Sequence, residues 1–427
     1  MRRLLAFTLS IFAKLILRKY RPIVIGITGS VGKTSTKQAC LAALGGKFRV
    51  RATAGNYNTE VGVPLTMIGA AGGGGSIMRW LPVFVRALQL IFSRDSEYPE
   101  ILILEFGADR PGDIARHSRL ARPKIGVITA ISPVHTEYFG SEAGVAREKA
   151  ALIAGLPKDG LAILNADACD GPILAKKTKA PVVMYGIHRP PEKFEEKFVA
   201  GSDLAVVQET GARVPLGMRL KVSTEGTIVP IFLPNVFGLQ HASAALAACA
   251  VSRALGMNLV EAAEGLRQYA GAPGRMHVIA GIKDTLIIDD TYNASPRAME
   301  MALEQVALLK PEEGAERIAV IGDMLELGAL SKEAHEKIGA LIARLDYDLL
   351  VTVGPLGKHI EYAARNAGMD ESRIAVFDDA DSAGKFVQEK IETGDIILVK
   401  GSRGIHMERI VREIMADPLR AEEILVH

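Results

Sequence analysis

A run of residues near the beginning of the sequence has the types and the spacing of a phosphate-binding loop: Thr28-Gly29-Ser30-Val31-Gly32-Lys33-Thr34. The short apolar run Ile23 to Ile27 precedes it and a helix-forming segment follows. This order of strand, turn and helix directs backbone N–H groups and the positive helix end toward a phosphate. Lys33 adds a mobile positive charge, and Thr34 can place its hydroxyl on Mg²⁺. We expect this loop, through Ser35, to hold the phosphates of a nucleotide; an ordinary glycine turn is the competing interpretation.

A carboxylate follows a second apolar run. Glu105 comes directly after Ile101 to Leu104, so it lies at the carboxyl edge of the predicted sheet, where α/β proteins bind their ligands. Carboxylate oxygens are among the ligands that Mg²⁺ prefers. Position alone leaves Glu105 open between a magnesium ligand and a structural acid.

The runs that would position these residues alternate with helix-length segments, which is typical of a mostly parallel sheet with crossover helices. Between 174 and 234, beginning with Val182 to Tyr185, short strands with turn residues favour a small antiparallel sheet inserted in or attached to this domain. Alternation resumes after Gly271. We predict an α/β chain with an N-terminal helix (1–22), a central P-loop ATPase domain (23–270) and a C-terminal Rossmann-like domain (271–427). The remaining runs that read as parallel strands are Ile125 to Ile128, Leu161 to Leu164, Thr285 to Ile288, Ile318 to Ile321, Leu349 to Val353, Ile374 to Phe377 and Ile396 to Val399.

The composition argues against several classes of function. A formal charge of +2 over 427 residues, with 23% charged side chains, gives no reason to expect nucleic acid as a partner. The cysteines Cys40, Cys169 and Cys249 are far apart and lack CxxC spacing, so neither a disulfide framework nor a structural zinc site is indicated. Buried thiols in a reducing, cytoplasmic setting explain them.

Two segments are candidates for contact with a membrane surface. In residues 1–21 an apolar run is combined with cations that fall within roughly 60° of one another on a helical wheel: Arg3, Lys14, Arg18 and Arg21. The uninterrupted apolar stretch is shorter than the ~20 residues that span hydrocarbon, so three interpretations are open: an interfacial helix, a helix packed on the protein itself, or a signal segment. Ile77 to Phe92 carries the only tryptophan and two arginines in an apolar background, and is either interfacial or part of the core.

The form of the phosphate loop is specific. Ile27 stands where the general NTPase pattern has its first glycine, and Thr28 to Ser35 read Thr-Gly-Ser-x-Gly-Lys-Thr-Ser, which resembles the loop of the Mur ligases. Further motifs resemble, in order, those members of the family that add D-alanyl-D-alanine to a muramoyl tripeptide. The segments that carry the resemblance are Gly55 to Thr66, Leu104 to Ala108, Ile131 to Ser141, Ala146 to Ala150, Pro234 to Gly238, Pro273 to Met276, Ile288 to Pro296, Val320 to Gly328 and Leu398 to Gly404.

The resemblance implies an ATP-dependent amide-bond ligase and gives roles to single residues. Glu105 corresponds to a magnesium ligand, His135 to a histidine at a second magnesium, and Lys149 to a lysine that carbon dioxide carbamylates into an oxygen-donor anion. Without the resemblance, His135 would be a capping or core residue and Lys149 a solvated helix residue. The implied metal ligands are Thr34, Glu105, His135 and Lys149. The implied catalytic residues are Lys33, Lys149, His135 and Arg275.

Other positions correspond to contacts with nucleotide and substrate. Asn235 resembles the asparagine that holds the adenine ring. Arg275 presents a guanidinium fork suited to the γ-phosphate, and Asp290 can accept hydrogen bonds from ribose hydroxyls. Asn293 belongs to the same motif as Asp290, and we expect it at both the nucleotide and the substrate. A lysine and an arginine at a strand end could receive the carboxylate of an incoming dipeptide. The predicted substrate residues are Asn58, Thr59, Asn293, Lys400, Ser402 and Arg403.

The sequence departs from its relatives in two places. Gln240, His241 and Ala244 replace a histidine and two asparagines, which puts the contacts of those positions in doubt. Family members begin with a domain that grips a uridine nucleotide, whereas only ~25 residues precede the loop here, too few for a domain. We therefore expect a different recognition of the acceptor, which is either nucleotide-linked or presented on a lipid carrier at the inner face of the membrane.

The reaction that the resemblance implies has two steps. The acceptor carboxylate attacks the ATP γ-phosphate, and an amine, either a dipeptide or an amino acid, then displaces phosphate from the acyl phosphate. Two alternatives compete with a ligase of peptidoglycan precursors: a related ligase of another poly-amino-acid or cell-surface polymer, and a non-catalytic nucleotide-binding scaffold at the membrane. The presence of Lys33, Glu105, His135, Lys149 and Arg275 favours an enzyme.

Overall fold

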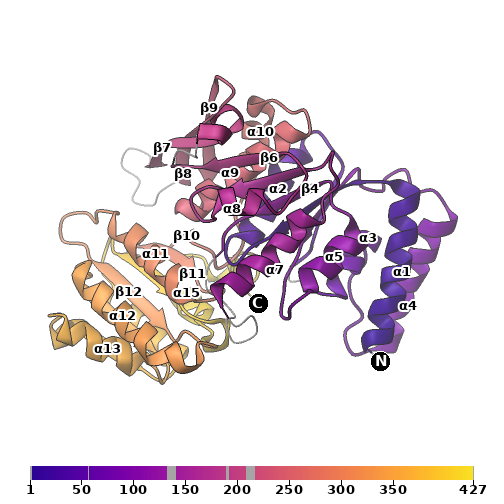
Figure 1. Ribbon diagram of the computed structural model, residues 1–427. Coiled ribbons are helices and arrows are strands. Elements are labelled where there is room, and N and C mark those ends of the chain that lie inside the picture. The colour runs from indigo at the N-terminus through magenta and orange to yellow at the C-terminus, as the bar shows by residue number, and fades with distance from the viewer. Residues whose placement is uncertain (1, 56, 132–140, 189–191, 208–216, 427) are drawn as a thin grey trace. The chain divides into compact units, whose positions relative to one another are not determined.

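Two compact units make up the protein in a computed structural model that describes residues 2–55, 57–131, 141–188, 192–207 and 217–426 (Figure 1). Within these residues, one nine-stranded and one six-stranded sheet, both mostly parallel, confirm the predicted α/β class. The domain limits at 22 and 270 stay predictions. By their internal contacts, the first unit comprises Met1–Leu204, Leu220–Phe232 and Gln240–Tyr269, and the second comprises Ala205–Arg219, Leu233–Leu239 and Ala270–His427.

The nine-stranded sheet has the order β2-β3-β1-β4-β5-β6-β7-β8-β9. β1 lies between β3 and β4, so the strand order reverses beside it, and ligands bind at such a switch point. The register sets Ile27 opposite Glu105, which brings the phosphate loop and the predicted carboxylate to the same edge. The strands are β1 (Ile23–Thr28), β2 (Val50–Ala52), β3 (Ile101–Glu105), β4 (Ile125–Ile128), β5 (Leu161–Asn165), β6 (Val182–Gly186), β7 (Val199–Val207), β8 (Gly217–Thr224) and β9 (Thr227–Pro234).

The strands expected in an antiparallel sheet inserted in or attached to this domain continue the nine-stranded sheet. The prediction was wrong for Val182 to Tyr185, because β6 runs parallel to β5 and β7. The crossover through α8 (Gly171–Ala175) allows the parallel direction that a tight turn would forbid. β8 and β9 are joined by Glu225 and Gly226, both with positive φ, which is the turn of an antiparallel hairpin.

Helices flank this sheet, and their sequences explain their limits. α2 begins at Lys33, directly after Gly32, whose φ of 84° is in the left-handed region. α10 begins with a capping box between Asn258 and Glu261. Besides α8, the helices that flank this sheet are α1 (Arg2–Tyr20), α2 (Lys33–Gly45), α3 (Gly62–Ile68), α4 (Ile77–Phe92), α5 (Asp113–Ala121), α7 (Glu142–Ala154), α9 (Leu239–Ala254), α10 (Leu259–Leu266) and the 3₁₀ helix η1 (Glu192–Lys197).

The six-stranded sheet has the order β10-β11-β15-β12-β13-β14, antiparallel only at its β10 edge. The segment 233–239 belongs to this unit: Val236 pairs with His277, and Phe237 joins the hydrophobic core that includes Met276 and Ile288. The strands are β10 (His277–Ala280), β11 (Leu286–Asp290), β12 (Arg317–Gly322), β13 (Leu349–Val353), β14 (Ile374–Phe377) and β15 (Ile396–Lys400). The helices are α11 (Pro296–Ala307), α12 (Ser331–Arg344), α13 (Gly357–Asn366), α14 (Ala380–Lys390), α15 (Glu408–Ile414) and α16 (Ala421–Ile424), with 3₁₀ turns η2 (Ile282–Asp284), η3 (Gly328–Leu330), η4 (Glu371–Arg373), η5 (Arg403–Ile405) and η6 (Pro418–Arg420).

α1 packs on its own unit along one face. Leu9 and Ile16 are fully buried in a cluster that also holds Val83 and Leu90 of α4. Figure 1 shows α1 and α4 side by side, and the rings of Phe12 and Phe84 meet edge to face with centroids 6.0 Å apart. No described helix combines the length and the apolarity needed to cross a membrane.

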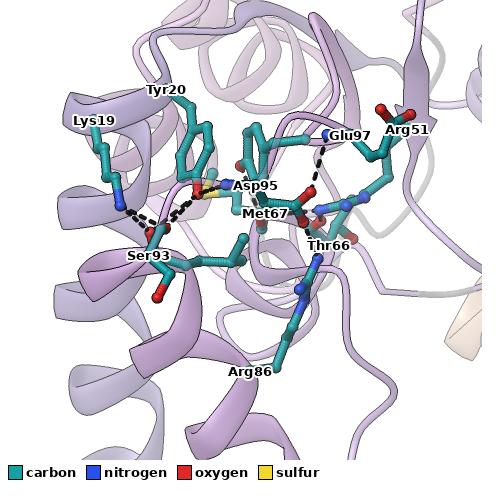
Figure 2. Close-up of polar contacts among 11 residues, drawn as sticks. Lys19, Tyr20, Arg51, Thr66, Met67, Arg86, Ser93, Asp95 and Glu97 are labelled. Atoms are coloured by element: carbon teal, nitrogen blue, oxygen red, sulfur yellow. Dashed lines mark hydrogen bonds and ion pairs between the residues drawn. The ribbon is translucent and has the colours of Figure 1, made fainter.

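Polar contacts join the ends of α1 and α4 (Figure 2). The Lys19 Nζ donates to the carbonyl oxygens of Leu90, Ile91 and Ser93 at 2.8, 2.9 and 2.6 Å. These are carbonyls of the last turn of α4 and of the residue after it, so a cation from one helix caps the negative end of the other. The Tyr20 hydroxyl accepts from the Asp95 N–H at 2.9 Å, which extends the tie past the helix end.

Candidate active site

The phosphate loop has the conformation that only its glycines allow. A Cβ on Gly29 would lie 2.1 Å from the Thr129 hydroxyl oxygen and 3.0 Å from the Ala130 nitrogen, so any side chain would clash with β4's continuation. Ser30 N–H donates to the Ala130 carbonyl at 2.8 Å, and the Thr129 hydroxyl donates to the Val31 carbonyl at 2.5 Å. These bonds hold the loop open between strand and helix, with the start of α2 at its end.

Lys33 folds back over its own loop. Its Nζ donates to the carbonyl oxygens of Gly29 at 2.8 Å and Ser30 at 3.2 Å. These two carbonyls hold the ammonium beside the loop, where it can approach a bound phosphate. The side chain is half-buried, so a phosphate would attract the charge through a partly desolvated medium.

Glu105 is the centre of a polar cluster that joins three segments. Its carboxylate accepts from the Thr34 hydroxyl at 3.2 Å and from the Asn58 amide at 3.3 Å. It also forms an ion pair with Lys37 at 3.2 Å, and the two side chains are 4% and 0% exposed. The predicted metal residues Thr34 and Glu105 are thus within hydrogen-bond distance, and the predicted substrate residue Asn58 touches the same carboxylate.

Lys149 is buried on α7 and lines the same cavity as Lys33. Burial, followed by the nearby charge of Lys33, lowers the pKa of Lys149 to about 8. The preceding Glu148 accepts from the backbone N–H groups of Gly112 at 2.7 Å and Ile114 at 2.8 Å, which caps the start of α5. The sequence interpretation of Lys149 as a solvated residue in the absence of a special role was therefore wrong, because this helix face is covered.

A cavity of about 1120 Å³ opens beside the phosphate loop. Gly29, Ser30 and Lys33 line one part of it, and the predicted substrate residues Asn58 and Thr59 line another. Residues of α5 and α1 also line it. Cations outnumber carboxylates among its lining residues: Lys14, Lys33, Arg110, Arg116, Arg119 and Lys149 against Glu60, Asp109 and Asp113. Such a wall suits an anionic ligand.

The second sheet brings three predicted residues together at its own carboxyl edge. Lys400 Nζ forms an ion pair with Asp290 at 2.6 Å and donates to the Asn293 carbonyl at 2.9 Å. The Lys400 side chain is 2% exposed. Tyr292 follows Asp290 by two residues, and the Arg275 guanidinium stacks on its ring, 4.2 Å from the centroid. Asp290 and Lys400, which we predicted at ribose and dipeptide respectively, are therefore partners of each other.

Three further predicted residues have local roles in the second unit. The Ser402 hydroxyl accepts from the Leu325 N–H at 2.9 Å. Arg403 pairs with Glu408 at 3.3 Å. Asn235 is exposed, has a φ of 54°, and accepts through its carbonyl from the Val278 N–H at 3.1 Å.

The residues fit a magnesium ion in part. His135 lies outside the described residues, and within the described chain no group of three or more His, Cys, Asp and Glu side chains could hold a metal. Mg²⁺ bound with nucleotide keeps several waters and needs only one or two protein oxygens beside phosphate. Thr34 and Glu105, 3.2 Å apart at the loop, can supply these oxygens.

Two important residues, Lys37 and Glu148, were missed by the sequence interpretation. Lys37 was not singled out, although it is one helical turn after Lys33 and so shares its face. Glu148 caps α5 from 34 to 36 residues further along the chain, so no local sequence pattern indicates this role. His241, whose role was in doubt, is fully buried, and its Nδ1 lies 2.7 Å from the Tyr269 hydroxyl, so it belongs to the core.

Comparisons with known proteins agree with this geometry. Residues 85–252 match the Mur ligase middle domain, and residues 274–403 match the Mur ligase glutamate ligase domain. A UDP-N-acetylmuramoyl-tripeptide–D-alanyl-D-alanine ligase of Bacillus subtilis is 32% identical over 95% of this chain and 79% of its own length. The chain belongs to the Mur ligase family. Mur ligases are ATP-dependent acid–amino-acid ligases, and this chain is one of them.

Other Mur ligases support the same assignment. The tripeptide–D-alanyl-D-alanine ligase of Escherichia coli is 31% identical over 92% of this chain and 76% of its own length. The crystal structure of the MurF ligase of Thermotoga maritima in complex with ADP has a TM-score of 0.73 and 25% identity, covering 96% of this chain and 83% of that one. A MurF structure from Acinetobacter baumannii, with 24% identity and a TM-score of 0.76 over 96% of this chain and 81% of that one, shares the fold.

Proposed function

We propose that this Mur ligase joins D-alanyl-D-alanine, or a similar amine, to the carboxylate of a muramoyl peptide. The observation that carries the proposal is that the phosphate loop, with Lys33, lines the same cavity as Lys149, Asn58 and Thr59. The two relatives described above are named for this reaction. ATP supplies the energy, and the products are an amide, ADP and phosphate.

The chain's own residues position and stabilise the reacting groups. A carboxylate oxygen of the acceptor attacks the γ-phosphorus, the bond to ADP breaks, and the amine nitrogen then attacks the acyl carbon while phosphate leaves. The loop N–H groups and Lys33 hold the phosphates and stabilise the charge that builds up during transfer. The amine loses a proton as the amide forms. Arg275 stacks on Tyr292, which keeps its fork preformed for a phosphate.

Magnesium and a carbamate complete the proposed site. Thr34 and Glu105 would hold Mg²⁺, whose charge would neutralise phosphate oxygens. Carbon dioxide reacts with a neutral amine, and a pKa of about 8 gives Lys149 a larger neutral fraction at pH 7 than an exposed lysine has. The carbamate is an anion, and its neighbour Lys33 offers it a counter-charge. We propose His135 as the remaining magnesium contact, and a cytoplasmic location at the inner face of the membrane.

ADP release tests the function. Purified protein should release ADP only when ATP, Mg²⁺, a muramoyl tripeptide acceptor and D-alanyl-D-alanine are all present. Lys33→Ala should lower this coupled turnover by about 10³-fold, since the lysine stabilises the transferring group. Lys283→Ala, a lysine of the second unit that donates to the Ile391 carbonyl, is the matched control.

The same assay separates the alternatives. Turnover with another amino acid and not with D-alanyl-D-alanine would assign the enzyme to a different polymer. Nucleotide binding without turnover across an amine screen would indicate a scaffold. Unchanged coupled turnover in Lys33→Ala would contradict the proposed role of the loop.

A further inference from the structure

α1 and α4 each expose an apolar strip that no described residue covers. The strips repeat at the three- and four-residue spacing of one helical face. Met78 and Phe92, at the two ends of α4, are 85% and 82% exposed. A solvated helix would carry polar side chains there. The α1–α4 face consists of Leu4, Phe7, Ile11 and Leu15 of α1 and Met78, Leu81, Val85, Leu88 and Phe92 of α4.

The two strips point out of the same side of the helix pair. Lys19 meets the carbonyls at the end of α4, so the helices run in the same direction (Figure 2). Taking the contact of Phe12 with Phe84 as reference, the exposed strip of α1 lies about 100° to one side and that of α4 about 90° to the other, at 100° per residue. Because the two helices are parallel and their strips are rotated in opposite directions from the shared contact, both strips lie on the same surface of the helix pair.

The charges of this surface have one sign. Neither helix contains an aspartate or a glutamate. Lys14 and Arg18 are exposed on or beside the α1 strip, and neither forms an ion pair with a carboxylate in the described part of the chain. An apolar strip bordered by cations is complementary to a bilayer with anionic headgroups. A second copy of the chain is a poor occupant, because a symmetric dimer would bring these cations together.

The α1–α4 face continues into the catalytic cavity. Phe7 and Lys14 belong to the exposed face of α1 and also line the cavity that contains Lys33. The same cavity is lined by Arg119 of α5, which is exposed and, like Lys14, has no ion-pair partner among the described carboxylates. A ligand could therefore extend from the α1–α4 face, past two cations, to the phosphate loop.

We propose that the α1–α4 face docks on an anionic bilayer and that the cavity receives an acceptor anchored in that bilayer. This inference rests on the proposed ligase function and names its acceptor: a lipid-linked muramoyl peptide, with Lys14 and Arg119 at the phosphate group that joins sugar to lipid. The apolar strips hold the cavity mouth at the headgroups, where the anchored acceptor is concentrated. The acceptor's carboxylate then reaches the phosphate loop while its lipid stays in the membrane.

Sedimentation with vesicles tests the docking. The full chain should pellet with phosphatidylglycerol vesicles and less with phosphatidylcholine vesicles, since cations contribute to binding. Leu81→Glu/Phe92→Glu should weaken binding by about tenfold or more, because the strip loses apolar area and gains charges of the wrong sign. Leu419→Glu, at a leucine that is 93% exposed in the second unit, is the matched control and should bind as the wild type does. Equal binding of the double variant, no binding of the wild type, or a dimer that the double variant dissociates would each overturn the proposal.

Acceptor kinetics test the link to the cavity. With lipid-linked acceptor in phosphatidylglycerol vesicles, Leu81→Glu/Phe92→Glu should raise KM about tenfold, while kcat with a short, soluble muramoyl peptide stays at the wild-type value. Arg119→Met, on α5 and outside the α1–α4 face, should raise KM for the lipid-linked acceptor and leave vesicle binding within about threefold. A preference for nucleotide-linked acceptor over lipid-linked acceptor would overturn the inference and keep the proposed function. Vesicle binding without ADP release from any acceptor would instead contradict the proposed function.

Discussion

The carboxyl edges of the two sheets carry similar residues in opposite states. At the first edge, Lys33 is bonded to carbonyls of its own loop and lines an open cavity with Lys149. At the second edge, Lys400 is 2% exposed and is held 2.6 Å from Asp290. A lysine that follows a strand or a turn in an α/β sheet can thus be held ready for a ligand or can serve as a structural ion. The difference lies in whether the lysine side chain lines an open cavity or is enclosed beside a carboxylate.

The largest effect is expected from a substitution at the edge of the first sheet. Lys149→Met should lower coupled turnover on the order of 10²–10³-fold, as expected when a preorganised charge is lost from a phosphoryl-transfer site. Its stability should not fall, since methionine removes the cost of burying an ammonium. ADP release and thermal unfolding would be measured together. Bicarbonate should raise wild-type turnover in degassed buffer and leave the variant unaffected; an equal response of both proteins would count against the carbamate.

The next effect concerns stability at both edges. Lys37→Met removes the Lys37 cation from the buried Glu105 carboxylate and should lower the free energy of unfolding by about 3–5 kcal/mol. Lys400→Met should cost less, because the Asp290 side chain is 14% exposed and water can solvate part of its charge. Urea unfolding followed by circular dichroism measures this loss. Adding Asp290→Asn to Lys400→Met should recover part of it, because no unpaired charge then remains. A loss from Lys400→Met below about 1 kcal/mol would mean that the pair is not structural.

The pH dependence of stability should have opposite signs at the two edges. Burial lowers the pKa of His117 from 6.5 to about 4, so the unfolded chain takes up this proton first and stability falls as pH drops from 6.5 to 4. Burial raises the pKa of Asp289 from 3.8 to about 6, so the folded chain binds this proton first and stability falls as pH rises from 4 to 6.

Replacing either His117 or Asp289 should leave the pH dependence of stability that the other residue causes. His117→Phe should flatten the loss of stability toward low pH, and Asp289→Asn should steepen it, each by on the order of 2 kcal/mol across the window. Unfolding temperatures between pH 4 and 7 measure both. Parallel curves for the variants and the wild type would show that neither group titrates in this way.

The smallest effect on stability is expected at the contact between α1 and α4. Lys19→Met removes three bonds to the end of α4, and because the ammonium is exposed it should cost only about 1 kcal/mol. Hydrogen exchange should speed up in the last turn of α4 and stay unchanged in α9. Lys358→Met, at an exposed lysine of α13, controls for loss of charge alone.

Local patterns predicted the parts of the molecule that depend on neighbours in sequence. The apolar runs gave the strands, and Gly29 with Gly32 gave the turn, because a strand, a glycine turn and a helix are defined within about fifteen residues. The register of β1 beside β3 then brought Glu105 to Thr34, as the carboxyl-edge rule predicts. The mostly parallel arrangement followed from the spacing of the runs.

Contacts across long stretches of sequence could not be predicted in the same way. Lys37 looks like an exposed helix residue until Glu105 is placed beside it, and Lys149 looks solvated until its face is covered. The partner of Lys400 lies 110 residues earlier in the sequence, so an assignment to the dipeptide rested on residue type alone. For α1, the buried face confirms packing on the protein itself, and contact of the exposed face with a membrane stays a prediction.

The short segment 233–239 has a consequence for how such a protein can evolve. It contributes Val236 to the edge of the second sheet and Phe237 to its core, although β11, the strand that carries Asp290, begins about fifty residues later. A gene fragment that began at codon 271 would encode the six-stranded sheet with a hole in its core. A recombination or deletion point at residue 271 would therefore remove part of the core of the second unit, so genetic dissection there is cleaner with point substitutions.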